Sequence, residues 1–313
     1  MPGGQPLRDH GGGLDAACTR WGGARETWLD LSTGINPVAY PIPDLPAHAW
    51  TTLPDRDAQE ALTAAARDFW AVPDTADILA ASGASALIAR LPLIAPAGPV
   101  DIPAPTYNEH AAAFRISGRK IDPDGTTRVL VHPNNPDGRL WSSDEFSDGL
   151  TIIDESFCDV CPEASHVQTA TDPNRVILKS FGKFWGLAGL RLGFAIGHPD
   201  TLTPLRDALG PWPVSGPALA IGAAALSDTE WAATTRTLLH ADAIRLDALM
   251  ARHGTLVGGT DLFRLYDVGD CRKMQDHLAQ NNIWSRVFPY SDKWLRLGLP
   301  HPNAWNQLEK ALA

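Results

Sequence analysis

Short apolar segments separated by turns and helical stretches constrain the fold of this 313-residue chain more than any other feature. Each segment has the length of a buried strand rather than that of a helix. Short buried strands that alternate with helical or loop segments are typical of a mostly parallel sheet with helices on both faces. The segments of this kind span residues 77–82, 98–105, 127–133, 150–156, 175–182 and 191–197.

Two helical patterns flank this series of strands. Residues 57–70 carry apolar side chains at helical spacing and are followed by a proline-containing loop. Residues 230–254 form the longest helical pattern in the chain, and Gly254 stands where a C-capping glycine is expected. The stretch after Gly254 alternates β-like and helical segments, which predicts a small α+β unit.

These patterns predict an α/β protein with three parts. Residues 1–45, rich in glycine and proline, are expected to form an irregular N-terminal arm. Residues 46–229 are expected to form a large doubly wound domain around the mostly parallel sheet. Residues 230–313 are expected to form a linker helix followed by the small C-terminal domain.

Composition excludes several classes of function. The formal net charge is −10, which argues against a general surface for nucleic acid or for an anionic membrane. No apolar signal segment is visible near Met1, and the longest apolar runs are too short to span a bilayer. We therefore expect a cytoplasmic protein that binds a small molecule and neither nucleic acid nor membrane.

The four cysteines do not form a disulfide framework in a chain of this length. Cys158 and Cys161 form a CxxC pair, but a zinc site with this spacing needs a second pair of ligands. We therefore interpret both residues as reduced thiols and expect no metal site.

Polar residues follow three of the predicted strands, at the edge where doubly wound sheets bind their ligands. Asn135 follows the third segment, Asp154 ends the fourth, and Lys183 follows the fifth. Arg191 comes eight residues after Lys183. An amide, a carboxylate, an amine and a guanidinium at neighbouring strand ends are chemically suited to one heterocyclic phosphate cofactor.

Pyridoxal 5'-phosphate requires these four groups. A lysine binds its aldehyde covalently, and a carboxylate keeps its pyridine nitrogen protonated so that the ring withdraws electrons. A side-chain donor meets the ring oxygen, while an arginine and backbone N–H groups hold the phosphate. The glycine, leucine and aromatic residues around Lys183 favour the neutral amine that the covalent bond needs, because desolvation lowers the pKa of a lysine.

Each of these residues has a simpler explanation when it is taken alone. Asn135 lies in an ordinary turn sequence, and Asp154 has the chemistry of a helix N-cap or of an ion-pair partner. Lys183 could extend its amine to water, and Arg191 could pair with a surface carboxylate. The order of all four at strand ends favours the cofactor site over these separate explanations.

The motifs NNPDG, IIDESF and SFGKFWGLAGLRLG occur in this order along the chain. With their spacing, the chain resembles the fold-type I pyridoxal-phosphate enzymes of the class I/II aminotransferase group. Within that group it is similar to the threonine-phosphate decarboxylases of cobalamin biosynthesis. The stretches that carry this similarity are 9–17, 28–37, 103–114, 210–219 and 294–300.

The resemblance implies a role for each residue around the cofactor. Lys183 binds the aldehyde covalently, Asp154 meets the pyridine nitrogen, and Asn135 meets the ring oxygen. Tyr107 stacks on the pyridine face, although ordinary aromatic packing would also explain it. The residues expected to hold the phosphate are Gly83, Ala84, Ser85, Ser180 and Arg191.

The resemblance also implies residues on the substrate side, which includes the N-terminal arm. Arg296 is expected to bind the α-carboxylate of the substrate, and Asn36 is expected to border it. His10 is expected to lie near a substrate phosphate. A surface ion pair, a turn and a helix cap are the ordinary alternatives for these three residues.

The implied activity is decarboxylation of L-threonine O-3-phosphate to (R)-1-aminopropan-2-yl phosphate by a homodimer. Phe157 stands where aminotransferases of this group commonly carry a tyrosine, and the chain is short, so peripheral helices are expected to be trimmed. The main alternative is an aminotransferase that acts on a phosphorylated substrate, like the histidinol-phosphate aminotransferases. A second alternative is a non-catalytic module that keeps the fold, and the intact set of cofactor residues argues against it.

Overall fold

The computed structural model describes residues 10–313, so residues 1–9 of the expected arm, including Asp9 of the similar stretch 9–17, lie outside it. The chain divides into two compact units. The larger unit is Val38–Leu238, and the smaller unit combines the preceding residues up to Pro37 with Leu239–Ala313.

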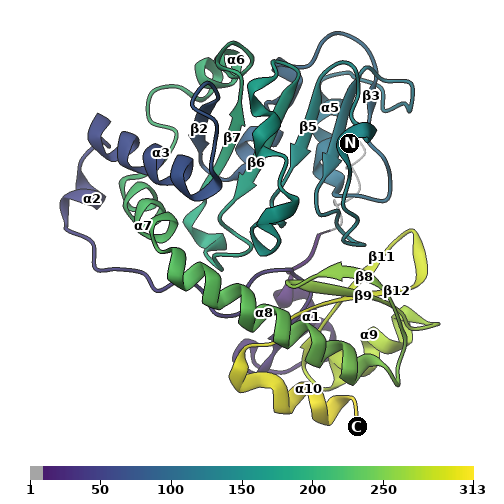
Figure 1. Cartoon of the computed structure of the whole chain (residues 1–313). Helices are drawn as coiled ribbons and strands as arrows, with labels where there is room; N and C mark the ends of the chain where they lie inside the picture. Colours follow the sequence, from purple (N-terminus) through teal and green to yellow (C-terminus); the bar gives the residue numbers. More distant parts are fainter. Residues whose placement is uncertain (1–9) are drawn as a thin grey trace, which may run out of the picture. The chain divides into compact units, whose positions relative to one another are not determined.

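The larger unit is built on a six-stranded sheet with the order β2-β7-β6-β5-β4-β3 (Figure 1). The strands β3, β4, β5 and β6 are parallel, and β7 alone runs antiparallel to both of its neighbours. The strands β5 and β7 are buried along their whole length, as expected for a sheet covered on both faces. The strand bounds are β2 Asp77–Ala81, β3 Val100–Asp101, β4 Thr127–Val131, β5 Thr151–Asp154, β6 Arg175–Ser180 and β7 Gly193–Gly197.

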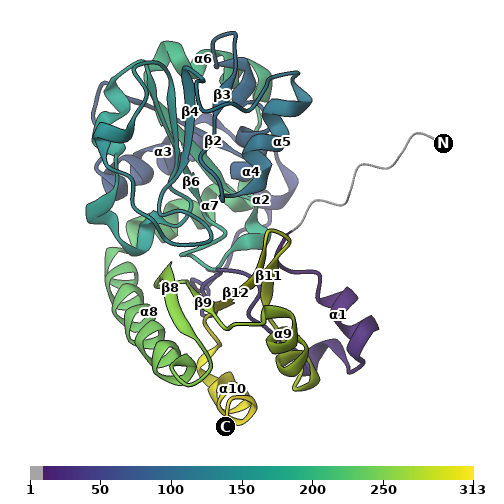
Figure 2. The same ribbon diagram turned by 90° about the vertical axis from the view of Figure 1, so that its right-hand side faces the viewer.

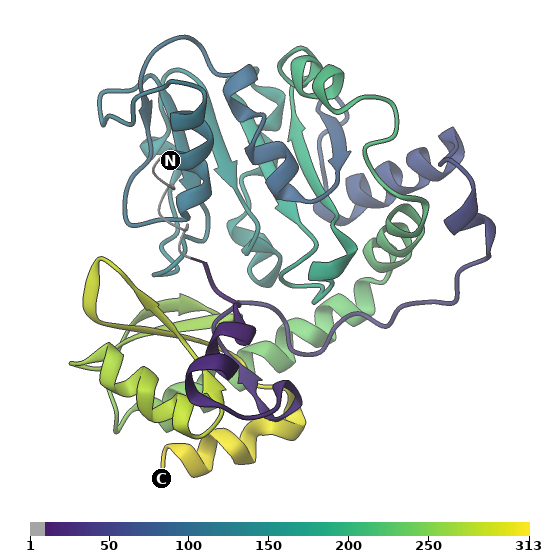
Figure 3. The same ribbon diagram turned by 180° about the vertical axis from the view of Figure 1, so that it is seen from behind.

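Helices cover both faces of this sheet. The helices α3 and α7 pack against each other in front of it (Figure 1), and α4 and α5 lie in front of it in the view from behind (Figure 3). On the α4 and α5 face, Leu87, Phe114, Ile152 and Leu178 belong to one buried apolar cluster. The helices of this unit are α2 His48–Thr51, α3 Arg56–Trp70, α4 Ala84–Ile88, α5 Asn108–Ile116, α6 Pro199–Leu209 and α7 Gly216–Ser227.

The smaller unit contains a four-stranded antiparallel sheet with the order β11-β12-β9-β8. The helix α9 packs along β11 and β12 (Figure 2). The bounds are β8 Thr255–Thr260, β9 Phe263–Asp267, α9 Cys271–Gln280, β11 Arg286–Phe288, β12 Ser291–Gly298 and α10 Trp305–Ala311. The long helix α8, Thr229–Met250, contains the point at which the two units divide.

The first part of the expected irregular arm is ordered secondary structure of the smaller unit. The helix α1, Leu14–Trp21, is followed by β1, Leu29–Asp30, which pairs in parallel with β10, Ile283–Trp284. The rings of Trp21 and Trp284 lie 5.3 Å apart. The prediction of an irregular segment was wrong here, because apolar contacts with a distant part of the chain stabilise a helix in a glycine-rich sequence.

Gly254 lacks the left-handed backbone expected of a C-capping glycine, although its N–H donates to the Met250 carbonyl oxygen at 3.0 Å. The helix α8 ends at Met250, and Gly254 does not have a positive φ. A Cβ at Gly254 would lie 2.5 Å from the Asp267 carbonyl oxygen, so the glycine is required by the close approach of two backbone segments. The single turn Ser143–Glu145 between β4 and β5 agrees with the expected trimming of peripheral helices.

Residues 10–313 contain neither a membrane-spanning helix nor a cluster of metal-binding side chains. No helix in that range combines the length and the apolar character needed to cross a membrane. The same range contains no group of three or more His, Cys, Asp or Glu side chains that could hold a metal ion.

Candidate active site

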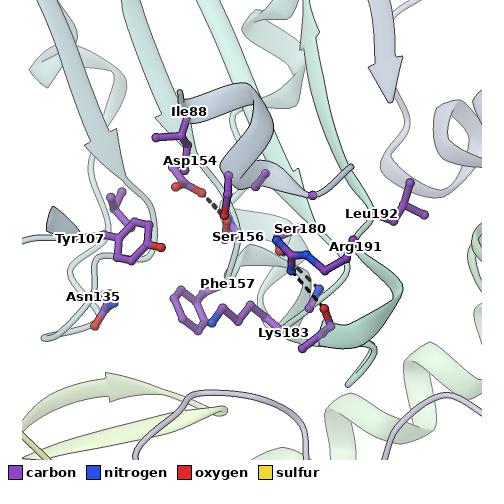
Figure 4. Close-up of a pocket in the computed structure, with 16 residues that line it drawn as sticks. Ile88, Tyr107, Asn135, Asp154, Ser156, Phe157, Ser180, Lys183, Arg191 and Leu192 are labelled. Carbon is purple, nitrogen blue, oxygen red and sulfur yellow. Dashed lines mark hydrogen bonds between the residues drawn. The ribbon is translucent and has the colours of Figure 1, made fainter. Parts of the chain in front are cut away.

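A cavity of about 200 Å³ lies in the larger unit, where β4, β5 and β6 end (Figure 4). Residues that follow successive strands line it, as the sequence predicted for a doubly wound sheet. Ser156, Phe157 and Gly182 line it as well. The cofactor residues predicted from the sequence all belong to its lining: Gly83, Ala84, Ser85, Tyr107, Asn135, Asp154, Ser180, Lys183 and Arg191.

The antiparallel strand β7 explains how Arg191 reaches this cavity. Because β7 runs against β6, the start of β7 lies beside the end of β6, and Gly193 pairs with Ser180. Arg191 precedes β7, adopts a left-handed backbone (φ 53°) and donates from Nη1 to the Ala188 carbonyl oxygen at 3.1 Å. Its side chain is therefore delivered to the same edge as the carboxyl ends of the parallel strands.

Gly83 leaves room in the cavity beside the Arg191 guanidinium group. Its φ of 84° disfavours any other residue, and a Cβ there would lie 2.8 Å from Arg191 Nη2. A Cβ at Gly193 would lie 2.3 Å from the Ala84 nitrogen, so β7 also approaches the start of α4 closely. The guanidinium group and the turn that begins α4 therefore stand together, as anion binding requires.

Asp154 is the last residue of β5 and is only 2% exposed. Its Oδ2 lies 2.7 Å from His110 Nε2, and its Oδ1 accepts from the Ser156 backbone N–H at 3.0 Å and the Ser156 hydroxyl at 2.5 Å. Burial alone would raise the pKa of Asp154, but the His110 and Ser156 contacts outweigh it and the pKa is lowered. The carboxylate therefore stays ionised at neutral pH.

His110 was not identified from the sequence. It lies on α5 with no exposed surface, and its ring centroid is 6.0 Å from that of Tyr107. The spacing of three residues between Tyr107 and His110 is the one available signal, because it puts both rings on the same side of a helix start.

Asn134 is a second residue that the sequence analysis did not single out. Its Nδ2 donates to the Pro105 carbonyl oxygen at 3.0 Å and to Asp137 Oδ1 at 2.8 Å. Its Oδ1 accepts from the Thr106 hydroxyl at 2.6 Å. Asn134 thus ties the loop that carries Tyr107 to the turn that carries Asn135, and both of those side chains face the cavity (Figure 4).

Lys183 lies with its Nζ 5.1 Å from the centre of the Phe157 ring. The neighbouring side chains of Phe181, Phe184 and Trp185 are fully buried, whereas Lys183 itself is half-buried. The amine is therefore held beside an aromatic face at the edge of the core, an environment that opposes full hydration of its charged form.

The residues around the cavity fit the predicted cofactor, pyridoxal 5'-phosphate. An ionised carboxylate (Asp154), an amine (Lys183) and a guanidinium (Arg191) surround the same space, with Tyr107 and Asn135 on the remaining side (Figure 4). This is the set of groups needed for a ring nitrogen, an aldehyde, a phosphate and a ring oxygen. The glycine that leaves room beside the guanidinium supports the same assignment.

The three residues predicted for the substrate belong to the smaller unit. Arg296, on β12, is 5% exposed and donates from Nη2 to the Ser32 carbonyl oxygen at 2.7 Å. Burial and the charge of nearby Arg286 lower the pKa of Arg296 to about 10. Asn36 is buried and His10 is exposed, and their roles toward a substrate stay predictions.

Arg286 is a further residue that the sequence analysis missed. It pairs with Arg296 in the β11–β12 register, and its Nη1 donates to the His10 carbonyl oxygen. Two guanidinium groups therefore belong to paired strands of the smaller unit, and groups of this kind bind carboxylate and phosphate with paired hydrogen bonds.

Known proteins resemble this chain in sequence and in fold. The family model for aminotransferase class I and II matches residues 122–308. A threonine-phosphate decarboxylase from Sinorhizobium sp. is 39% identical and covers 97% of this chain and 97% of its own length. A threonine-phosphate decarboxylase from Pseudomonas aeruginosa is 37% identical and covers 98% of this chain and 97% of its own length.

Among solved structures, a histidinol-phosphate aminotransferase from Sinorhizobium meliloti, in complex with pyridoxal-5'-phosphate, has a TM-score of 0.82. It covers 100% of this chain and 97% of its own, at 17% sequence identity. This likeness confirms the predicted fold class, a mostly parallel central sheet with helices on both faces and a small α+β unit.

Proposed function

Because this chain belongs to the aminotransferase class I and II family, we propose that it is a pyridoxal-phosphate enzyme that decarboxylates L-threonine O-3-phosphate. The product would be (R)-1-aminopropan-2-yl phosphate, for cobalamin biosynthesis. One observation carries this proposal: two relatives named threonine-phosphate decarboxylase are 37% and 39% identical over nearly the whole chain.

The larger unit supplies the groups that would hold the cofactor. When bound, the cofactor supplies an electron-withdrawing ring that accepts the electron pair released from the substrate. Asp154 holds a proton at the ring nitrogen, since its carboxylate is kept ionised by His110 and Ser156. Lys183 would hold the cofactor aldehyde, and its amine is the group placed to give a proton to the substrate Cα.

The smaller unit supplies groups with the charge that the substrate requires. The substrate has two anionic ends, a carboxylate and a phosphate, and guanidinium groups bind both with paired hydrogen bonds. We assign the carboxylate to Arg296 and the phosphate to Arg286 and His10, which are joined by the Arg286–His10 hydrogen bond. Asn36 is assigned to the border of the substrate.

The apolar side chain at position 157 favours decarboxylation over amino transfer. Phe157 lines the cavity beside the Lys183 amine and adds no hydroxyl group to it. An aminotransferase acting on a phosphorylated substrate is the second candidate, since a histidinol-phosphate aminotransferase has the same fold.

We also assign the enzyme to the cytoplasm as a homodimer. Trp50, Leu53 and Trp212 expose 69%, 66% and 54% of their surface in the larger unit. A Cβ at Gly216 would lie 2.3 Å from the Ala49 carbonyl oxygen, so α2 and the start of α7 are in contact. Exposed aromatic side chains of this kind are typical of interfaces between chains. Sedimentation analysis of Trp50→Glu beside the wild type tests this assignment, because a monomeric wild type would contradict it.

The test of the function is incubation of the cofactor-loaded protein with L-threonine O-3-phosphate alone. Carbon dioxide and the amine product are both measured, because decarboxylation releases one molecule of each per molecule of substrate. We expect both products in equal amounts without any keto acid. Amino transfer that begins only when 2-oxoglutarate is added would instead identify the aminotransferase, and no reaction in either mixture would favour the non-catalytic module.

A further inference from the structure

A buried ionic cluster lies on the face of the β5–β6 pair opposite to the cavity. Lys179 Nζ is 2.6 Å from Glu155 Oε2 and 3.7 Å from Asp159 Oδ1. The exposed fractions of Lys179, Glu155 and Asp159 are 1%, 1% and 3%. Removing charges from water is costly even when they are paired, so a cluster of three in the core calls for a reason beyond stability.

The cluster is adjacent in sequence to the cavity on both strands. Successive strand residues point to opposite faces, so Asp154 and Ser180 face the cavity while Glu155 and Lys179 face away from it. The main-chain bond from the Glu155 N–H to the Leu178 carbonyl oxygen, 2.9 Å, keeps the two strands in this register. On each strand, a residue of the cluster is therefore the direct sequence neighbour of a residue that lines the cavity.

Asp159 connects the two loops that carry Phe157 and Lys183, the residues that contact each other in the cavity. Asp159 stands two residues after Phe157, and Trp185 stands two residues after Lys183. Trp185 Nε1 donates to Asp159 Oδ2 at 3.2 Å. This hydrogen bond thus connects the loop that bears the Phe157 ring with the loop that bears the Lys183 amine.

Aromatic packing makes Trp185 a rigid connection. Its indole is stacked on Phe181 at 5.1 Å and 10°, and on Trp231 at 5.3 Å and 14°. Its backbone carbonyl accepts from the Tyr40 N–H at 2.9 Å. Two stacked rings prevent the indole from rotating. A shift of its hydrogen-bond partner Asp159 would therefore move the Trp185 backbone as well.

The other atoms of Asp159 are bound by parts of the fold outside these loops. Trp70 Nε1, from α3, donates to Oδ1 at 2.9 Å, and Arg236 Nε donates to the backbone carbonyl oxygen at 2.7 Å. The carboxylate therefore has one indole partner on each oxygen. The Trp70 bond fixes it to a helix, and the Trp185 bond passes on its position to the Lys183 loop.

We propose that Asp159 is a positioning residue that, through Trp185, holds the Lys183 amine against Phe157 in the orientation needed to bind the cofactor aldehyde. This role rests on the proposed pyridoxal-phosphate chemistry and adds to it a group that never touches the cofactor. Lys179, with its Nζ 3.7 Å from Asp159 Oδ1, helps to hold the Asp159 carboxyl group in place, and Glu155 in turn holds the Lys179 amine at 2.6 Å.

The test compares two matched variants, Trp185→Phe and Trp70→Phe. Each removes one indole N–H from the same carboxylate and keeps an aromatic ring. The rate of formation of the covalent lysine–cofactor bond is measured from its visible absorbance after pyridoxal 5'-phosphate is added to cofactor-free protein. Borohydride trapping and mass spectrometry confirm that the modified residue is Lys183, and thermal unfolding reports stability.

Trp185→Phe is expected to slow bond formation about tenfold, the effect of losing one hydrogen bond to a buried carboxyl group. It is also expected to shift the pH midpoint of the absorbance change. Trp70→Phe removes a bond to Asp159 but leaves the Trp185 connection in place, so it is expected to lower the unfolding temperature and to slow bond formation much less than Trp185→Phe does. Equal slowing in the two variants, or an unchanged rate in Trp185→Phe, would overturn the proposal.

A second variant covers the case in which Trp185→Phe does not fold. Asp159→Asn keeps the shape of the side chain and weakens both indole bonds, so it is expected to reproduce the slow bond formation. A wild-type rate in Asp159→Asn would overturn the proposal. Because no amino acid substrate is present, these outcomes are independent of decarboxylation, and a wild type that forms no bond would reject the cofactor assignment instead.

Discussion

The two faces of the β5–β6 pair carry similar groups for different purposes. On one face, Asp154 borders a cavity in which the Lys183 amine stands beside an aromatic ring. On the other face, Lys179 Nζ and Glu155 Oε2 form an ion pair at 2.6 Å, and both residues are only 1% exposed. One lysine lines the cavity, and the other forms a buried ion pair.

The surroundings of each lysine, rather than its distance in sequence from a carboxylate, account for this contrast. The carboxylates near Lys179 raise its pKa despite burial and keep it charged, so it cannot act as a nucleophile. Lys183 projects from a loop into the cavity and is half-buried. Substitutions of the two lysines should therefore differ most in their effect on stability.

The largest effect is expected from Lys183→Ala. Loss of the amine that holds the cofactor and moves the proton should reduce decarboxylation about 10²–10⁴-fold or more, while the unfolding temperature stays near that of the wild type. Carbon dioxide release and thermal unfolding measure the two quantities. Lys273→Ala, an exposed lysine on α9, is the control and should change neither. Unchanged turnover in Lys183→Ala would mean that the cavity is not the active site.

A large loss of stability is expected from Lys179→Met. This substitution leaves Glu155 and Asp159 buried without their cation, and it should lower the free energy of unfolding by about 3–5 kcal/mol. Urea denaturation measures the change. The double variant Lys179→Met/Glu155→Gln removes one of the two uncompensated charges and should recover part of the loss. If Lys179→Met is as stable as the wild type, the cluster contributes nothing to the fold.

The cofactor side of the cavity could be predicted because its residues follow short apolar segments. Parallel strands bring their carboxyl ends to one edge, so Asn135, Asp154 and Lys183 were expected to be neighbours before any distance was known. Arg191 was predicted from its motif, and its geometric reason, the antiparallel direction of β7, appears only in the sheet.

The remaining parts depended on packing that no local pattern encodes. His110 meets Asp154 because α5 lies over the end of β5, and the sequence separation of 44 residues conceals that contact. Glu155 and Lys179 each follow a buried strand residue, and only the register that pairs Asp154 with Leu178 brings them together. The helix α1 was missed for the same reason, since its stability comes from contacts with α9 and β10 rather than from its own sequence.

The pH dependence of stability sharpens the comparison at Asp154. Its pKa in the folded state lies below the value of about 3.9 in an unfolded chain, so its contribution is present above that value and is lost as the pH falls through the folded pKa. His110→Phe removes the largest opposing influence and leaves burial to raise the pKa. The variant should lose about 1–3 kcal/mol near pH 7.

Unfolding temperatures between pH 3 and pH 7 measure this effect. The wild type should become more stable as the pH rises through the region of the Asp154 pKa, and His110→Phe should lose that gain or reverse it. Asp154→Asn is the control, because it removes the titrating group and should flatten the same region. A wild-type pH profile in His110→Phe would show that the histidine does not hold the carboxylate ionised.

The smallest effect is expected from Phe157→Tyr, which changes the cavity face by one hydroxyl. The ring that contacts Lys183 is retained, and the new hydroxyl adds one donor to a cavity whose polar groups come from other positions. One neutral hydrogen bond should slow cofactor dissociation and raise the share of amino transfer over decarboxylation by about two- to tenfold. Tyr107→Phe, which removes a hydroxyl from the same cavity, is the matched control and should not raise that share. If Phe157→Tyr leaves both quantities unchanged, the choice of reaction does not depend on the apolar ring beside Lys183 and must be made by the residues that orient the substrate carboxylate.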